Sequence, residues 1–371
     1  MTEKTRNRFI NDIYVNREYS WLLFDKRVLE QSQDLSNPLL ERCKFLSIFS
    51  SNLDEFFMVR VGSLYNESLS DAQARDNKTQ LTAAKQLEGV CEAVRDLYAE
   101  RAVCYSRLKK ELSKYGVRIL RADELTPRQK EEAKTVFMTH VLPLLSLMVL
   151  DAKHPLMQFE NMKNYMLYNL ERDGRHMVGV MAFNAALDRL YRIGGGEKAR
   201  LVPLEELVRA FGHNAFTGYT AGGKMMMRVT RNADFDTNID DSDVERDFSE
   251  IMKKKVESRA RLNVVRLEID REDEKLKEFV LKLLKLHPRF CFCDERFFDY
   301  KFMFSLDKYL PPERSLPLKY PPFKGAVAKE LCGAPSLIET VFRRDVFLSY
   351  PYDSMTPLVD LLEECALDKR V

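Results

Sequence analysis

Asn52 lies on one face of a predicted helix together with apolar residues, and its position points more directly to chemistry than that of any other residue. The apolar members, which recur with Asn52 at spacings of three and four, are Phe45, Phe49, Phe56 and Val59. A buried amide without hydrogen-bond partners costs roughly 1–3 kcal/mol. Asn52 is therefore either a core residue satisfied by a neighbouring backbone group or a side chain aimed at a ligand, because an amide both donates and accepts.

Histidine is the second residue type with catalytic potential, because neutral imidazole is a nucleophile near neutral pH. Each of the five histidines falls in a helical or mixed region and is interpreted as structural or on the surface; they are His140, His154, His176, His213 and His287. The chain contains neither G-x-x-x-x-G-K-[ST] nor G-x-G-x-x-G, and no grouping of His, Cys and Asp has zinc spacing. Spacing alone thus identifies no catalytic residue and no metal ligand.

Length and composition describe a soluble globular protein of two or three domains. The chain has 371 residues, of which 45% are hydrophobic and 31% charged. A net charge of +2 argues against a general nucleic-acid coat but leaves room for a local basic channel. The N-terminus lacks the apolar core of a signal peptide, and no apolar run reaches the length of a membrane span. Seven scattered cysteines, an odd number, indicate reduced thiols in a cytoplasmic protein.

Three long helices are predicted to position Asn52. The first follows Ser20. The second has Asn37 as its N-cap and Pro38 as its first residue, and it runs to about residue 64. The third covers residues 80–114 and ends at Gly116. These helices would form an N-terminal bundle over residues 1–114, and the basic side chains of the third are interpreted as a solvated face: Arg95, Arg101, Arg107, Lys109 and Lys110.

Residues 115–322 read as an α+β domain on an antiparallel sheet. Strands are predicted at residues 117–120, 164–170, 177–183, 189–193, 224–231 and 263–269. Helices are predicted at residues 127–142, 203–211, 243–260 and 273–286. The proline-rich stretch 311–323 reads as the linker that ends this domain.

The last segment, residues 323–371, reads as the start of an incomplete α/β domain. DVFLSY, residues 345–350, is a predicted strand, and Thr356 and Pro357 are placed to begin a helix that runs to about residue 366. A strand followed by a helix is half of a βαβ unit, whose crossover needs a parallel partner strand. We therefore expect the sequence to be truncated within this domain.

Several segments, in order, resemble the N-terminal half of the long bacterial polyphosphate kinases. They are VNREYSWLLFDKRVLEQS, NPLLERCKFLSIFSSNLDEFFMVRV, RVTRNAD and FRRDVFLSYPYDS, and the resemblance covers about residues 15–371. In that family the Asn of SSNLDEFF contacts ATP, which assigns Asn52 to the nucleotide. The match at RVTRNAD makes Arg228 and Arg231 candidates for an electropositive polyanion tunnel, whereas the basic run at residues 253–261 is more simply a solvated helix face.

The resemblance implies a reaction as well as a fold. The family moves the terminal phosphate of ATP onto a histidine and then reversibly onto inorganic polyphosphate, with magnesium. The histidine lies in an H-x-K segment of a phospholipase-D-like catalytic domain, which residues 323–371 would only begin. None of the five histidines here is followed by lysine two positions later, and the family's magnesium-binding residues fall beyond Val371. We therefore expect no catalytic residue in this chain and no activity from it alone.

The remaining expectations concern partners. The family's head domain, residues 115–322 here, is implicated in dimer contacts, so a homodimer is implied. No nucleic-acid partner is expected, and peripheral membrane association of the full enzyme is left open. Around residues 144–157 the chain departs from the family pattern and keeps only His154-Pro155. The alternative, from a different functional class, is a non-catalytic binding or assembly module with the same architecture.

Overall fold

The computed structural model describes residues 14–150, 158–233, 262–271, 273–294 and 297–370. The chain divides into two compact units, residues 1–319 and residues 320–371, with the division inside the proline-rich stretch. Each unit is described separately.

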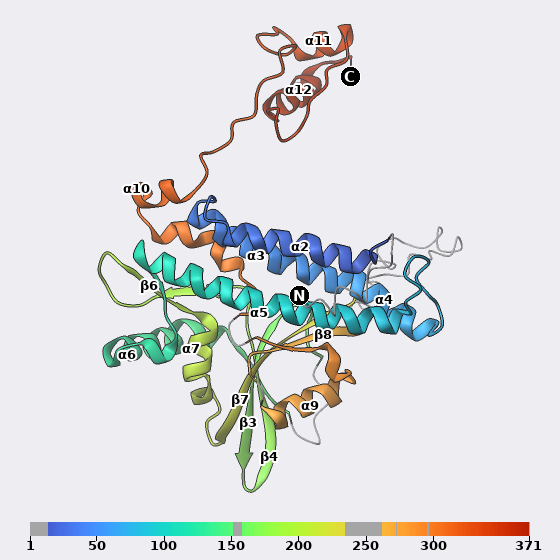
Figure 1. Cartoon of the computed structure of the whole chain (residues 1–371). Helices are drawn as coiled ribbons and strands as arrows, with labels where there is room; N and C mark the ends of the chain where they lie inside the picture. Colours follow the sequence, from blue (N-terminus) through green and yellow to red (C-terminus); the bar gives the residue numbers. More distant parts are fainter. Residues whose placement is uncertain (1–13, 151–157, 234–261, 272, 295–296, 371) are drawn as a thin grey trace. The chain divides into compact units, whose positions relative to one another are not determined.

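The first unit contains the three predicted helices, which lie side by side (Figure 1). Helix α2 covers Arg17–Gln33, and α5 covers Ala83–Lys114. Helix α3, Leu39–Phe56, continues without a break through a π-helical turn, η1 (Phe57–Val61), into α4, Gly62–Ser70. The predictions of a helix after residue 38 and of one ending at residue 114 are confirmed.

Two helix starts differ from prediction. Helix α2 begins before Ser20, because the Asn16 side chain accepts hydrogen bonds from the backbone N–H groups of Glu18 (3.0 Å) and Tyr19 (3.2 Å) and so caps it. The predicted N-cap at Asn37 is wrong: Pro38 is the N-cap of α3, and the Asn37 amide instead donates to the Gln31 carbonyl at 2.9 Å.

A six-stranded sheet forms the centre of the first unit, in the order β2-β4-β3-β7-β8-β9. All neighbours are antiparallel except β8 and β9, so the prediction of an antiparallel sheet is confirmed for most of it. The strands are β2 Ser146–Leu150, β3 Asn164–Arg172, β4 Arg175–Ala182, β7 Thr220–Arg231, β8 Val264–Ile269 and β9 Cys291–Cys293. Strands β2 and β9 were not predicted.

A second, three-stranded sheet has the order β1-β6-β5, with β1 and β6 parallel. Its strands are β1 Val117–Ile119, β5 Leu190–Arg192 and β6 Ala199–Pro203. Sequence analysis predicted β1 and β5, but β6 was not predicted.

Helices cover both faces of the large sheet. Alternate residues of β3 show this: Tyr165 and Leu167 pack in the core shared with α2, α3 and α5, whereas Met166 and Tyr168 pack in the core on the opposite face. Helices α6 (Pro127–Val136) and α7 (Leu204–Phe211) contribute to that opposite core, and α9 (Glu274–Leu284) contributes to the first one. The shorter helical segments are η2 Ala122–Glu124, η3 Phe137–Val141, η4 Leu142–Leu144, η5 Gly212–Ala215 and η7 Pro288–Phe290.

Two sequence features at residues 243–261 fall outside the described residues. They are the predicted helix 243–260 and the basic run 253–261. The first unit ends in η8 (Lys301–Tyr309), α10 (Pro312–Ser315) and η9 (Leu316–Leu318). Because Ser315 and Leu318 are buried, the first part of the predicted linker is packed rather than extended. None of the helices in the described part of the chain is long and apolar enough to cross a membrane.

The second unit contains two helices, α11 (Leu337–Arg343) and α12 (Thr356–Leu367). The prediction of the last helix is confirmed, but the prediction of a strand at residues 345–350 is wrong for the structure described. A strand needs a hydrogen-bonded neighbour, and within residues 320–370 only a single bridge, Ala326 to Asp353, forms. Residues 345–349 have no regular structure and lead into a turn, in which the Ser349 backbone N–H donates to the Asp353 carboxylate at 2.7 Å.

Candidate functional site

Helices α2 and α3 run antiparallel and bring Asn52 against Asp25. The Asn52 amide nitrogen, Nδ2, donates to Oδ1 of Asp25 at 3.1 Å. The Asn52 side chain is partly exposed, and its own oxygen, Oδ1, accepts no hydrogen bond from any described residue. The partner is thus a carboxyl group from another helix, not the neighbouring backbone group that sequence analysis considered.

Asn52 lies at the rim of the buried face of α3 and not at its centre. Of the apolar residues that share its predicted stripe, Phe49 and Phe56 are fully buried, but Val59 is 45% exposed. Its position at the rim leaves one end of the amide accessible while the other end is held by Asp25.

Asp25 was not singled out by sequence analysis. It is fully buried, and its second oxygen, Oδ2, has no hydrogen-bond partner among the described residues. Burial raises the pKa of Asp25 to about 7, against the opposing effects of the Asn52 hydrogen bond and the Arg101 charge. The same periodicity that identified Asn52 could have identified it, because Asp25 follows Trp21 by four residues and precedes Val28 by three.

Aromatic rings lie one helical turn away from this pair. The ring of Trp21 stacks on that of Phe56, with centroids 4.4 Å apart and planes 12° apart. The ring of Phe24 meets Trp21 edge-on at 6.4 Å, and Phe24 is 47% exposed. An amide oxygen and an exposed aromatic ring therefore lie on neighbouring turns of two packed helices, a combination suited to a planar, polar ligand.

The opposite side of α3 carries Asp54, which enters a buried cluster of charges. Two nitrogens of Arg228 donate to the Asp54 carboxylate at 2.8 and 3.2 Å, and Arg266 donates to it as well. Arg228 also donates to Glu268 at 2.7 Å, and the Tyr98 hydroxyl donates to the other Glu268 oxygen at 2.8 Å. The cluster joins α3 and α5 to β7 and β8, and its two carboxylates balance its two guanidinium groups.

The carboxylates and guanidinium groups of the cluster stabilise each other's charged forms. Burial disfavours ionisation of Glu268, but Arg228, Arg266 and Arg101 outweigh it and hold the pKa of this carboxyl below its usual range. Burial raises the pKa of the Tyr98 hydroxyl, so Tyr98 remains a donor. The cluster is a structural connection between helices and sheet, because all four charged side chains are almost completely buried.

The interpretation of Arg101 as part of a solvated face is wrong. Arg101 is fully buried; it donates to Asp294 at 2.5 Å, and its guanidinium lies 4.0 Å from the centre of the Tyr98 ring. A signal was present, since Arg101 follows Leu97 by four residues and precedes Tyr105 by four, and both are buried.

The two tunnel candidates are engaged by protein groups. Arg228 is buried in the charge cluster. Arg231 is partly exposed and donates to the backbone carbonyls of Phe159 and Leu262 at 2.8–3.1 Å. The residue after it, Asn232, contacts the helix that carries Asn52. Gly62 makes this possible, because a Cβ at position 62 would lie 2.2 Å from the Asn232 side-chain oxygen.

The remaining chemical candidates lie away from Asn52. His140 and His176 are exposed, His287 caps η7, and burial beside Lys224 lowers the pKa of His213. His154 falls outside the described residues. Within the described ranges, no group of three or more His, Cys, Asp or Glu side chains is arranged to hold a metal ion.

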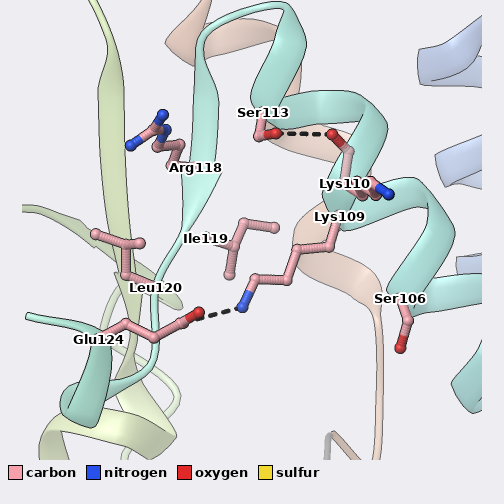
Figure 2. A pocket seen from close by; sticks show the side chains of 8 residues that line it. All are labelled: Ser106, Lys109, Lys110, Ser113, Arg118, Ile119, Leu120 and Glu124. Carbon is pink, nitrogen blue, oxygen red and sulfur yellow. Dashed lines mark hydrogen bonds and ion pairs between the residues drawn. The ribbon is translucent and has the colours of Figure 1, made fainter.

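A basic hollow of about 310 Å³ lies between α5 and β1 (Figure 2). Figure 2 shows Lys109 and Glu124 pointing toward each other. The Lys109 ammonium donates to the Glu124 carboxylate at 3.0 Å. Lys110 and Arg118 also line the hollow, so it carries net positive charge. It is lined by residues of α5, β1 and η2 together with Leu120, and does not include Asn52 or either tunnel candidate.

Comparison with known proteins places two domain families on this chain. The model of the polyphosphate kinase N-terminal domain matches residues 14–120, and that of the polyphosphate kinase middle domain matches residues 128–306. The chain is 33% identical to a polyphosphate kinase from Bacillus cereus, covering 96% of this chain and 52% of that protein. It is 30% identical to a polyphosphate kinase from Staphylococcus epidermidis, covering 96% and 48%.

The fold has a counterpart of known structure. The crystal structure of polyphosphate kinase from Porphyromonas gingivalis superimposes with a TM-score of 0.74 at 22% identity, covering 96% of this chain and 50% of that one. The mixed helical and α/β architecture is therefore shared. The chain spans about half the length of the curated relatives that it matches.

Proposed function

Because the chain belongs to the polyphosphate kinase family and matches its N-terminal and middle domains, we propose that it carries the nucleotide-contacting part of an enzyme that transfers the terminal phosphate of ATP to inorganic polyphosphate. One observation carries the proposal. The Asn52 amide is held at one end by Asp25, presents a free acceptor at the other, and lies one turn from exposed aromatic surface. These are the features that a nucleobase edge and face would use.

Replacing Asn52 with alanine should weaken ATP binding roughly threefold to tenfold. The reason is that one neutral hydrogen bond contributes about 0.5–1.5 kcal/mol. Calorimetric titration of the 371-residue chain with ATP measures the affinity, and a thermal melt of the same preparation measures stability. In a complete enzyme the change should fall on KM more than on kcat, since the base binds similarly in ground and transition states.

Asn66→Ala is the matched control, because Asn66 is exposed on α4, which continues the helix carrying Asn52. It should change neither quantity. If Asn52→Ala lowers the melting temperature while ATP affinity stays unchanged, Asn52 is a structural amide and the nucleotide assignment fails.

The chemistry that we propose for the whole enzyme is phosphoryl transfer through a phosphohistidine, located outside the residues of this chain. Support comes from the sequence, in which none of the five histidines has lysine two positions later. Phosphohistidine formation requires the imidazole nitrogen to attack the terminal phosphorus of ATP while ADP leaves, so a chain without that histidine cannot take the first step.

The 371-residue chain alone should therefore make no polyphosphate. Incubation with labelled ATP and a polyphosphate primer, followed by gel analysis of chain length, tests this. The Bacillus cereus relative, assayed in parallel, is the positive control. ATP-dependent extension by the purified chain would show that it contains a phosphoryl acceptor that sequence analysis did not recognise.

Magnesium, which the family implies, does not fit the carboxylates near Asn52. Asp54 already accepts hydrogen bonds from two arginines, and Asp25 is fully buried beside an amide. Hard divalent cations prefer several accessible oxygen ligands, which these residues do not offer. We therefore assign no step to a metal held by this part of the chain.

The assignment of Arg228 and Arg231 to a polyanion tunnel stays a prediction. Direct contact with polyphosphate would require each guanidinium to give up its present partners, which for Arg228 include two buried carboxylates. Exchange with a phosphate chain is more accessible to Arg231, because it is partly exposed and its partners are neutral carbonyls.

Further proposals concern assembly and location. We propose a homodimer formed through residues 115–322, and a catalytic domain of phospholipase-D-like fold that begins with the segment containing α12. We place the protein in the cytoplasm, a reducing compartment, because none of its seven cysteines forms a disulfide in the described structure. The proposed substrates are ATP or ADP and inorganic polyphosphate.

A further inference from the structure

We infer that Asp25 is a positioning residue for the nucleotide: it holds Asn52 in one of its two amide orientations, with Oδ1 facing outward, and so selects a base that presents an amino group. The inference rests on the proposed nucleotide contact at Asn52. It identifies a residue without ligand contact that decides which nucleobase is accepted.

The hydrogen bond between Asn52 and Asp25 determines which end of the Asn52 amide faces outward. An asparagine side chain can rotate by 180° and exchange its donor and acceptor ends, and its orientation follows from its partners. An ionised carboxylate accepts hydrogen bonds only, so above pH 7, where Asp25 loses its proton, its Oδ1 fixes the orientation in which Nδ2 of Asn52 points inward, at 3.1 Å. The opposite orientation would place two acceptor oxygens against each other.

Asp25 is buried although its burial is energetically unfavourable. Asp25 is fully buried, yet it makes a single hydrogen bond, and its other oxygen is left without a partner in the described structure. Burying a carboxyl group in this way is unfavourable, and an apolar side chain of similar volume would serve packing better. Burial of Asp25 is unfavourable, and its side chain forms a hydrogen bond only with Asn52. We therefore attribute its presence to the orientation that it gives the Asn52 amide.

Aromatic packing between α2 and α3 limits movement of Asn52 relative to Asp25. The stack of Trp21 on Phe56 lies one turn from the Asp25–Asn52 contact on both helices, so the spacing of α2 and α3 is set there by aromatic packing. Asn52 therefore cannot easily move away from Asp25. Its amide plane is held from the inner side only, which leaves Oδ1 directed to the exposed rim.

The outward Asn52 oxygen distinguishes adenine from guanine. An outward oxygen accepts a hydrogen bond from the exocyclic amino group of adenine, but it meets an acceptor, the O6 carbonyl oxygen, at the corresponding position of guanine. A mismatch of this kind leaves a polar group unpaired, and a preference for ATP over GTP of about tenfold is expected.

The test compares ATP and GTP affinities, measured by calorimetry at pH 8, for the full 371-residue chain and two variants. Asp25→Asn offers Asn52 an amide that can either accept or donate, so its preference for ATP should lie between those of the wild type and Asp25→Leu. Asp25→Leu fills the same space without an acceptor, frees the amide to rotate, and should reduce the ATP:GTP affinity ratio to within about twofold of one. Thermal melts establish that each variant is folded.

A second measurement needs no change at Asp25. In the NMR spectrum of the wild-type chain, the Asn52 side-chain amide is assigned by its absence from Asn52→Ala. Its Nδ2 protons should exchange with solvent far more slowly than those of exposed Asn66. Equal exchange rates would overturn the inference, even if Asp25→Leu failed to fold.

The outcomes separate this inference from the function on which it rests. If Asn52→Ala weakens ATP binding but Asp25→Leu leaves the ATP:GTP ratio unchanged, the positioning role is wrong and the nucleotide contact stands. If neither nucleotide binds, or Asn52→Ala has no effect on ATP affinity, both fail. A preference for ATP that falls from the wild type through Asp25→Asn to Asp25→Leu supports both.

Discussion

Replacing Asp54 with asparagine should lower the free energy of unfolding of the first unit by about 3–5 kcal/mol, because it leaves buried positive charge without compensation. Asp54 accepts hydrogen bonds from Arg228 and Arg266, and both arginines are almost completely buried. Asparagine has nearly the same shape, so the loss would come from charge and hydrogen bonding rather than from a cavity. The expected effect is large because neither guanidinium can reach water.

Urea unfolding followed by fluorescence of Trp21, the single tryptophan, measures this change. Glu55→Gln is a matched control, because it removes the same charge from the next residue of the same helix at an exposed position. It should change the free energy of unfolding by less than about 0.5 kcal/mol. Equal effects of the two substitutions would mean that the buried cluster adds nothing beyond general electrostatics.

Asp25→Asn should remove a pH-dependent loss of stability that the wild-type chain shows. Well below pH 3.8 Asp25 is protonated in both folded and unfolded chains. As the pH rises from 4 to 7 the unfolded chain releases this proton and the folded chain keeps it, so the folded state becomes less stable. A rise in pKa from 3.8 to about 7 corresponds to a loss of about 4 kcal/mol, complete above pH 7.

The difference in unfolding free energy between Asp25→Asn and wild type should therefore increase in favour of the variant between pH 4 and pH 8. Measuring both proteins at each pH cancels the contributions of other titrating groups. Glu30→Gln, an exposed site on the same helix, should give a difference that is almost independent of pH. A flat difference for Asp25→Asn as well would mean that Asp25 is ionised in the folded protein at low pH.

The long helices could be predicted from sequence, because each shows apolar periodicity over many turns together with a polar or glycine signal at its end. Gly116, with a φ of 99°, ends α5 as expected. Strands β3, β4, β7 and β8 of the large sheet were also predictable, since their runs of apolar residues are bounded by polar ones. Asp173 and Gly174, both with positive φ, form the tight turn between β3 and β4 that their dipeptide predicts.

The missed strands are short or depend on distant partners. Strand β9 has three residues and exists because it pairs with β8, more than twenty residues earlier in the chain. The Gly222-Gly223 pair predicts a turn but lies inside β7, because Gly223 leaves space for the Asp273 side chain; a Cβ there would lie 2.0 Å from Asp273 Oδ2. Such contacts between remote residues leave no mark on local periodicity.

The candidate site was predictable in part. Periodicity and family resemblance identify Asn52, but not its partner, which lies 27 residues earlier on another helix. The same holds for the buried charges: Asp54 and Arg228 are separated by 174 residues. A charged residue on a helix is usually solvated, so the misreading of Arg101 follows from a sound general rule that a distant carboxylate, Asp294, overrides.

The buried charge cluster has a consequence for how such chains can be recombined. Its helical members supply one carboxylate, Asp54, whereas the strands supply Arg228, Arg266 and Glu268 and so carry an excess positive charge. The contributions come from the two separately matched segments, residues 14–120 and 128–306. A chimera that exchanges one segment between relatives keeps a neutral interior only if it preserves both halves of this set. The two segments should therefore be inherited, transplanted and engineered as a single cassette.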